Sequence, residues 1–404
     1  MSFGSWNRKA TLSAAIAALA APAFAQDGTR LDFSGFAMLD MGYQKNQNHP
    51  DWCDVGRPTK LPSFEDEFGA DGNFYAGVRQ SRFGVRSYTP TDMGELRTIF
   101  EFELFGTGVD AGQTTFRLRH AWGELGKLGA GQTWSPFMDP DVFPNSVEYW
   151  GPNGMVFFRN VQLRFTPWQT DSGSRFVLAL ERPGASADQG VYADRVELAG
   201  VEANFPMPDI SGHFRSVGDW GHFQVAGIVR KMEWEDVVPG PGPINLSGDD
   251  IGWGVNVSSN IKLGNNVLRL QVVYGEGIQN YMNDAPADIG IRNNFGNPVQ
   301  PILGEALPLI GVVAFMDMNW SAKWTSTFGF SFVDIDNSDG QAPSAFKKGQ
   351  YALANLLYHP TSKVYFGPEI QWGDRENFSD GFSSDDLRIQ FSARYDFAGS
   401  LGNQ

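Results

Sequence analysis

The sequence contains a single cysteine, Cys53, so no disulfide can form within the chain, and the thiol is interpreted as incidental in a surface loop. Positive charge is also scarce, since 31 Lys and Arg face 46 Asp and Glu, for a formal net charge of −15. Nucleic acid requires a clustered basic surface, so it is not an expected partner. No apolar run approaches the roughly 18 residues that a membrane-spanning helix needs. These absences argue against nucleic-acid-binding proteins and helical membrane proteins.

The first 25 residues have the pattern of a signal peptide. Arg8 and Lys9 form a basic start, residues 10–21 form a short apolar run, and Ala23-Phe24-Ala25 is an A-x-A cleavage site. We therefore predict that the mature chain begins at Gln26 and is exported beyond the inner membrane. The expected domain organisation is a signal peptide (1–25), one strand-rich domain (26–397) and a short tail (398–404).

Many segments alternate apolar and polar residues with a period of two, which predicts β-strands with one apolar and one wet face. The last of them, DLRIQFSARYDF, places Leu387, Ile389, Phe391, Ala393, Tyr395 and Phe397 on one face. The 47 glycines and 14% aromatic residues are typical of many strands joined by turns. We count sixteen candidate strands: 30–44, 73–88, 95–105, 116–126, 127–134, 157–167, 174–181, 209–217, 222–235, 251–263, 267–281, 311–323, 324–336, 349–359, 363–377 and 385–397.

The connections between these segments alternate between short turns and long loops. Bacterial outer-membrane barrels have even strand numbers, short turns on one side and long loops on the other. A soluble sandwich has no need for this alternation. The predicted fold class is therefore all-β, a transmembrane antiparallel β-barrel of 16 strands in which the last strand pairs with the first, so that no edge is left in lipid.

The loop between Ser135 and Met155 is unusual because it combines prolines, acids and large aromatic residues. It carries the acids Asp139, Asp141 and Glu148 and the pair Tyr149-Trp150. Loops of this length are usually functional or disordered, and this one has too many large apolar residues for disorder. We predict that it folds into the barrel mouth and narrows a water-filled pore. An ordinary surface loop is the alternative.

The parity of the strands identifies arginines that face the lumen. If Phe83 and Val85 face lipid, Arg82 and Arg86 face inward. The same test predicts a basic wall on consecutive strands, consisting of Arg82, Arg86, Arg97, Arg117, Arg119 and Arg164, and it also points Arg215, Arg269 and Arg394 inward. Arg79 has the opposite parity and needs a bulge or a position outside the lipid band. The alternative role is structural pairing with Glu101, Glu103 or Asp396.

We expect the acids Asp139, Asp141 and Glu148 to face this wall and to create a transverse field at the constriction. Guanidinium groups stay charged and match carboxylates with two parallel hydrogen bonds, so the wall would pass an anion from one arginine to the next. Tyr149 and Trp150 could offer a solute an apolar face, although packing within the loop is favoured. Interfacial girdles or strand packing are the expected roles of Trp122, Trp134, Trp253, Trp320, Trp324 and Trp372.

Three stretches carry a resemblance to a known family: RQSRFGVRS (79–87), FRLRHAWGELG (116–126) and GQTWSPFMDPDVFPNSVEYWGPNG (131–154). With the strand pattern, they resemble the trimeric porins of Gram-negative bacteria, and more narrowly the DcaP-like porins. The resemblance implies a homotrimer in the outer membrane, contacts with lipid and lipopolysaccharide, and uptake of small anions such as dicarboxylates without a cofactor. The chain departs from the pattern in two ways: strands begin soon after the cleavage site, and AGSLGNQ follows the final aromatic residue.

Other functions remain open at this point. A general or sugar-selective porin lacks the anion preference, and a structural or adhesive barrel conducts nothing. A hydrolase is disfavoured because the five histidines are scattered and no G-x-S-x-G or H-E-x-x-H motif is present. The run 334–340 is similar to a calcium loop, but Ala345 stands where the bidentate glutamate belongs, so no metal site is predicted.

Overall fold

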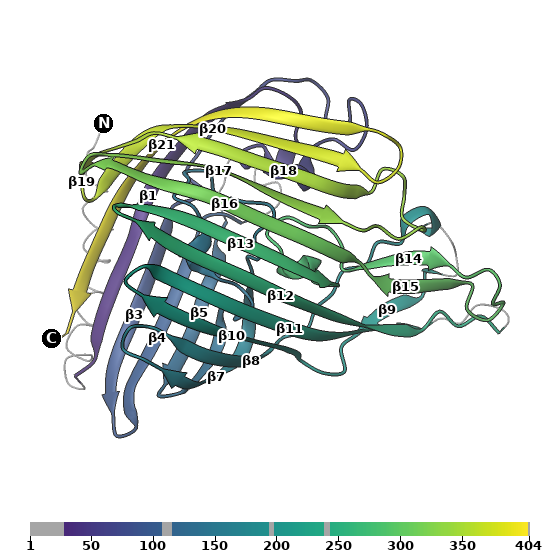
Figure 1. Cartoon of the computed structure of the whole chain (residues 1–404), viewed down its shortest axis with the longest axis horizontal. Helices are drawn as coiled ribbons and strands as arrows, with labels where there is room; N and C mark the ends of the chain where they lie inside the picture. Colours follow the sequence, from purple (N-terminus) through teal and green to yellow (C-terminus); the bar gives the residue numbers. More distant parts are fainter. Residues whose placement is uncertain (1–27, 107–114, 194–197, 238–242, 403–404) are drawn as a thin grey trace, which may run out of the picture.

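The computed structural model describes residues 28–106, 115–193, 198–237 and 243–402, and the predicted signal peptide lies outside them. The strands form a closed antiparallel barrel of 16 spanning strands (Figure 1), which confirms the predicted fold class and strand number. Among the described residues, no helix is both long and apolar enough to cross a membrane.

The spanning strands are β1 (Arg30–Gln44), β3 (Arg82–Thr91), β4 (Gly94–Glu103), β5 (Arg117–Leu125), β6 (Leu128–Trp134), β7 (Arg159–Gln169), β8 (Arg175–Glu181), β10 (Asp209–Gly218), β11 (Gly221–Asp236), β12 (Gly248–Leu263), β13 (Asn266–Glu276), β16 (Pro308–Ser321), β17 (Trp324–Ile335), β18 with β19 (Phe346–Asn355 and Leu357–Thr361), β20 (Val364–Asn377) and β21 (Ser383–Leu401). The additional strands are β2 (Asn73–Gly77), β9 (Val201–Asn204), β14 (Ile289–Asn293) and β15 (Ile302–Ala306). Short 3-10 helices lie at Pro50–Trp52, Pro58–Lys60, Pro140–Val142, Gly190–Tyr192 and Gln279–Tyr281.

The first and last strands close the barrel. They pair antiparallel from Leu31 opposite Leu401 to Gln44 opposite Arg388. The ladder continues past Phe397, so residues 398–401 belong to β21 rather than to a tail. Closure leaves no unpaired strand edge in the hydrocarbon layer, where an unpaired backbone group is costly.

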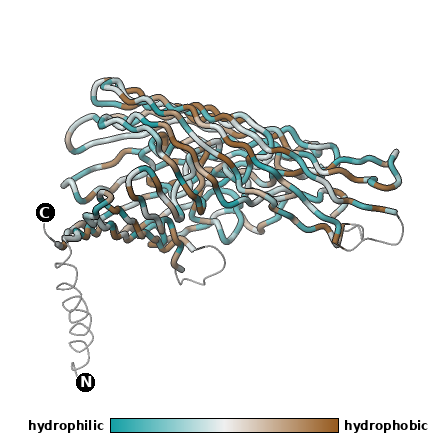
Figure 2. The backbone as a smooth tube through the Cα atoms, turned by 90° about the horizontal axis from the view of Figure 1, so that it is seen from below, coloured by the Kyte–Doolittle hydropathy of each residue, from teal (hydrophilic) through white to brown (hydrophobic). Residues whose placement is uncertain are grey.

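The period-two pattern sorts residues between the outside and the lumen. In β21 the side chains of Ile389, Phe391 and Tyr395 are exposed, whereas Gln390 and Ser392 are buried inside the barrel. Figure 2 shows brown and teal stretches alternating along the tubes of the barrel wall. The outer face therefore offers apolar side chains to lipid, and the polar face lines the interior.

The structure adds detail that the strand pattern did not predict. The expected strand at 73–88 is split into β2 and β3, and Arg79 lies in the break, which explains its opposite parity. The predicted loop 282–310 contains the hairpin β14–β15, and the predicted loop 182–208 contains β9. These short strands gather at the long-loop end of the barrel (Figure 1).

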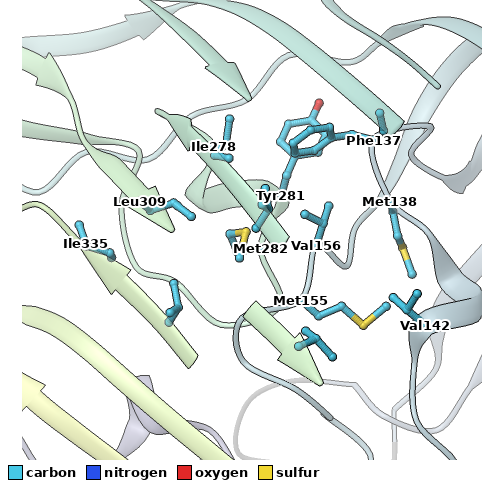
Figure 3. Packing of buried hydrophobic residues seen from close by; sticks show 14 of the residues in the cluster. Phe137, Met138, Val142, Met155, Val156, Ile278, Tyr281, Met282, Leu309 and Ile335 are labelled. Atoms are coloured by element: carbon cyan, nitrogen blue, oxygen red, sulfur yellow. The ribbon is translucent and has the colours of Figure 1, made fainter. Parts of the chain in front are cut away.

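The segment between β6 and β7, here called the constriction loop (135–158), folds into the barrel and packs on the inner face of the opposite wall. Its residues Phe137, Met138, Val142, Met155 and Val156 are fully buried. They pack in one apolar cluster with wall residues of β11, β13, β16, β17 and β18 (Figure 3). These strands are thus apolar on both faces, which fixes where the loop sits.

Gly154 marks the closest approach of the loop to the wall. A side-chain Cβ at this position would lie 2.0 Å from the carbonyl oxygen of Phe332 and 2.8 Å from that of Val312. Both contacts are backbone atoms of the wall, which cannot rotate away. Only glycine therefore allows this part of the loop to seat.

We predict that Gly154→Ala destabilises the folded barrel by about 1–3 kcal/mol, as overpacking of a filled interior does. The midpoint of heat-induced unfolding, followed by the mobility shift in SDS gels, should fall. Gly296→Ala is the matched control, because a Cβ at Gly296 meets no atom within 4 Å. Equal midpoints for the two variants would contradict the seating described here.

Candidate functional site

A cavity of about 600 Å³ lies between the constriction loop and the wall formed by β1, β3, β5, β6, β7, β20 and β21. The loop contributes Pro140, Phe143, Pro144, Asn145, Ser146, Glu148, Tyr149 and Trp150 to its lining. The segment after β13 adds Asn280, Met282 and Asn283. The cavity is therefore enclosed by the barrel wall on one side and by folded-in loops on the other.

Five guanidinium groups line this cavity: those of Arg82, Arg117, Arg119, Arg159 and Arg394. Three of them have carboxylate partners. Arg119 donates to Glu101 and Glu103 at 2.7 Å each, and Arg82 donates to Glu103 at 3.0 Å. Arg394 donates to Asp396 at 2.7 Å. These pairs hold the guanidinium groups in fixed positions on the wall.

The other two arginines have a different environment. Arg117 donates to the hydroxyl of Tyr149 at 3.1 Å, and Arg159 lies over the ring of Trp134 at 4.8 Å. Within the described part of the chain, neither of them pairs with a carboxylate. Nη1 of Arg159 is buried and has no hydrogen-bond partner there. The cavity wall therefore carries excess positive charge.

The six arginines of the predicted basic wall do not all meet in one place. Arg82, Arg117 and Arg119 line the main cavity. Arg97 and Arg164 line a second cavity beside the short turns at the other end of the barrel, where Arg97 is 57% exposed and pairs with Glu95 at 2.7 Å. Arg86 is exposed and lines neither of these two cavities. The predicted wall is thus divided between two levels of the barrel.

A β-bulge changes the direction of side chains in β5. The register with β4 shifts between Glu101 and Phe102, so that Arg119 and His120 both point inward. Trp122 consequently turns inside as well and lies under the guanidinium of Arg164, 5.0 Å away. Trp122 is therefore an interior residue that packs against Gly129 of the neighbouring strand β6, which agrees with strand packing and excludes a girdle position for it. Trp134 lines the main cavity. Bulges leave no signature in a period-two pattern.

Asp139 does not face the arginines across the cavity, contrary to the expected transverse field. It is 0% exposed and accepts hydrogen bonds from Arg215 at 3.0 Å, from His222 at 2.7 Å and from Ser258 at 2.7 Å. Asp141 also pairs with Arg215, while 54% of its side chain stays exposed. The two acids anchor the loop to β10, β11 and β12, and we call this group the loop latch.

Glu148 contributes to the cavity lining but is only 2% exposed, and among the described residues it pairs with none of the cavity arginines. Its carboxylate accepts bonds from the backbone N–H groups of Gly56, Trp150 and Gly151 at 3.0, 2.8 and 2.6 Å. The hydroxyl of Tyr351 lies 3.1 Å from it. Glu148 therefore stabilises the turn at the loop tip. Its carboxylate is occupied by hydrogen bonds to the backbone and is not available to a solute.

Tyr149 and Trp150 cross toward the basic wall. The Tyr149 hydroxyl donates to Glu103, and its ring stacks on Phe105 with centroids 3.6 Å apart. The Trp150 indole donates to the carbonyl of Asn283 at 2.8 Å and meets the ring of Trp52 edge-on. Packing within the mouth is therefore the main role of both, although both also line the cavity.

Sequence analysis missed Arg159 and the role of the first long loop. Arg159 is the first residue of β7 and has the parity opposite to Arg164, so the alternation rule points it outward. The rule does not hold at a strand end. Trp52 and Gly56 belong to the segment 45–72, which folds into the mouth instead of remaining outside. Because the segment is highly polar, its sequence did not indicate that it folds inward.

The side chains of Asp139, Asp141 and His222 come within 4.8 Å of one another, a spacing that could suit a metal ion. The guanidinium of Arg215 already pairs with both acids. A positive side chain in this position opposes a cation, so the cluster is an ion-pair network.

The DcaP outer membrane protein family model matches residues 7–212. The chain belongs to the DcaP outer membrane protein family. The family's proteins are channels of the Gram-negative outer membrane, which confirms the predicted localisation and the prediction that the chain is a porin and not an enzyme. None of the curated proteins compared with the chain matches it.

Solved structures of outer-membrane channels share the fold of this chain. The DcaP channel of Acinetobacter baumannii is similar with a TM-score of 0.74 and 19% identity, over 92% of this chain and 98% of that one. OmpT of Vibrio cholerae has a TM-score of 0.53 and 13% identity, over 92% and 98% of the two chains. An anion-selective porin from Comamonas acidovorans has a TM-score of 0.56 and 10% identity, over 91% of this chain and 100% of that one. At these identities the likeness shows a common fold.

We predict that Asp139→Asn loosens the loop latch, because it removes the buried carboxylate that Arg215 and His222 share. Losing one member of a buried ion pair costs about 3–5 kcal/mol, and a smaller loss is expected here because Arg215 keeps its contact with Asp141. Single-channel recordings in planar bilayers should show larger and noisier currents. Asp141→Asn is the control, since that side chain is half exposed and should change the current little. A quiet channel in Asp139→Asn would contradict the latch.

The latch should also survive mild acid. Burial alone would raise the pKa of Asp139, but the hydrogen bond and charge of His222, with Arg215 and Ser258, outweigh it and lower the pKa from 3.8 to about 2. A depressed carboxylate pKa stabilises the fold fully above pH 3.8, and this contribution is lost as the pH falls through about 2. Current noise should therefore stay constant from pH 7 to about 4 and increase below about 3. Noise that rises already near pH 5 would contradict this assignment.

Proposed function

We propose that this DcaP-family protein is a passive diffusion channel that favours small anions, dicarboxylates among them, over cations. The observation that carries the proposal is the excess of guanidinium groups in the main cavity. Arg117 and Arg159 lack a carboxylate partner in the described part of the chain, and Glu148, a loop acid in the cavity lining, bonds to backbone N–H groups instead. A permeating anion would meet fixed positive charge inside the main cavity.

The net negative charge of the chain is compatible with this preference. Ion selectivity depends on the charge within about a Debye length of the permeation path, roughly 10 Å at 0.1 M salt. The buried loop acids are neutralised locally by Arg215 and by backbone N–H groups. The paired guanidinium groups of Arg82 and Arg119 would add hydrogen-bond donors for a carboxylate.

The arrangement also favours brief binding rather than trapping. Arginines stand at two levels, with Arg82, Arg117, Arg119, Arg159 and Arg394 in the main cavity and Arg97 and Arg164 beyond it. An anion can leave one group as it reaches the next, which permits both entry and exit. In this proposal the predicted arginine wall acts as a relay with a gap between its two parts.

We further propose that the channel is a homotrimer whose outer face contacts lipid and lipopolysaccharide. Trimers are known for OmpT of Vibrio cholerae, whose solved forms include a trimer. Exposed apolar residues such as Phe100, Ile389 and Phe391 supply a surface for lipid or for a neighbouring copy. Export of the mature chain from Gln26 is part of the same proposal.

The test is the reversal potential of the reconstituted protein across a potassium chloride gradient. The unmodified channel should prefer chloride. In the double variant that combines Arg117→Gln and Arg159→Gln, the preference for chloride over potassium should fall by at least about threefold at 0.1 M salt. Both charges line the cavity, and in this proposal they lie within a Debye length of the permeation path.

Arg86→Gln is the matched control, since Arg86 does not line the cavity, and its preference should stay near that of the unmodified channel. An unmodified channel without anion preference would favour the alternative of a general or sugar-selective porin. A barrel that does not conduct would overturn both functions.

A further inference from the structure

Aromatic rings make up much of the main cavity's lining beside the constriction loop. Trp134, Phe143 and Phe157 all line it, and we call these three residues the aromatic strip. The Trp134 and Phe157 rings lie 5.0 Å apart, and the Phe157 and Phe143 rings lie 5.4 Å apart. Trp134 is the last residue of β6, whereas Phe143 and Phe157 lie in the middle and near the end of the constriction loop, so folding of the loop is what brings the three rings together.

Each ring of the strip has two environments. All three pack against the buried apolar cluster between loop and wall, yet each is only partly buried. The remaining surface belongs to the cavity lining. A purely structural packing role would be served by full burial, whereas these rings leave apolar surface exposed inside a pore.

Positive charge lies directly beside the strip. The guanidinium of Arg159 is 4.8 Å and that of Arg119 is 5.4 Å from the centre of a Trp134 ring. Arg119 is held by Glu101 and Glu103, but Arg159 has no carboxylate partner in the described part of the chain. One free guanidinium group and one apolar surface thus face the same cavity.

A ligand that uses both features must carry a negative group at one end and a flat apolar body at the other. A polar anion satisfies Arg159 but leaves the ring surface in water. An anion with an aromatic body can also cover Phe143 and Phe157, and aromatic contacts of this kind favour binding beyond simple burial.

We propose that the aromatic strip and Arg159 form a subsite for small carboxylates with a flat apolar body, with benzoate as the simplest example. The subsite gives these anions an advantage over polar anions of similar size and equal charge. This inference rests on the proposed anion channel and specifies which anions it favours.

The first experiment compares potassium benzoate with potassium gluconate in bi-ionic reversal-potential measurements on the unmodified protein in planar bilayers. After correction for mobility in free solution, benzoate should be favoured about threefold to tenfold, the size expected from one aromatic contact. This comparison needs no variant, so it tests the subsite even if a substitution prevents folding.

The second experiment removes the ring. Phe157→Ser should reduce the benzoate advantage at least about threefold while leaving the preference for chloride over potassium unchanged. Phe157→Tyr keeps a ring and should retain the advantage. Phe295→Ser, at an exposed position outside the cavity, is the matched control and should behave as the unmodified protein does.

The outcomes separate the two proposals. Equal permeation of benzoate and gluconate with the chloride preference intact overturns the subsite and leaves the anion channel standing. An unchanged benzoate advantage in Phe157→Ser also overturns the subsite. A channel that prefers potassium to chloride overturns both proposals, because no anion then has privileged entry.

Discussion

The pore of this DcaP-family protein depends on how the constriction loop is held against the far wall of the barrel. Apolar packing alone could let the loop slide, because such contacts are not directional. The bonds from Arg215, His222 and Ser258 to the buried carboxylate of Asp139 define one position. At the tip, Glu148 gathers three backbone N–H groups and fixes the turn. The loop is thus part of the barrel interior.

The charge of the pore follows from this anchoring. The acids that could neutralise the arginines hold the loop instead: Asp139 and Asp141 pair with Arg215, and the buried Glu148 bonds to backbone N–H groups. The guanidinium groups of Arg117 and Arg159 consequently remain without carboxylate partners within the described residues. The same fold turns the rings of Phe143 and Phe157 toward the cavity. A structural requirement of the loop therefore sets the proposed selectivity of the channel.

Much of the fold was predictable because apolar and polar residues alternate along each spanning strand and so distinguish its lipid face from its lumen face. The strand β1 was predicted to its bounds, and closure by the last strand followed from its unbroken apolar face. The rule failed where the backbone departs from regular pleating. The bulge near Arg119 turned Trp122 inward, and the strand end at Arg159 gave the opposite direction from parity. Neither departure changes the composition of its segment.

Sequence alone determined the fold class, the number of spanning strands, the family, and the presence of a long loop able to enter the pore. The fold class, the strand number and the loop follow from local periodicity and from the alternation of turn lengths, whereas the family follows from the resemblance of the stretches 79–87, 116–126 and 131–154. None of these requires knowledge of distant contacts. Only the tertiary structure decided which way the loop acids point, which arginines share a cavity, and that aromatic rings face them. Such properties depend on contacts between residues far apart in the chain, as between Asp139 and Arg215 or between Gly56 and Glu148. The choice among those contacts is made by how the closed barrel packs its own interior.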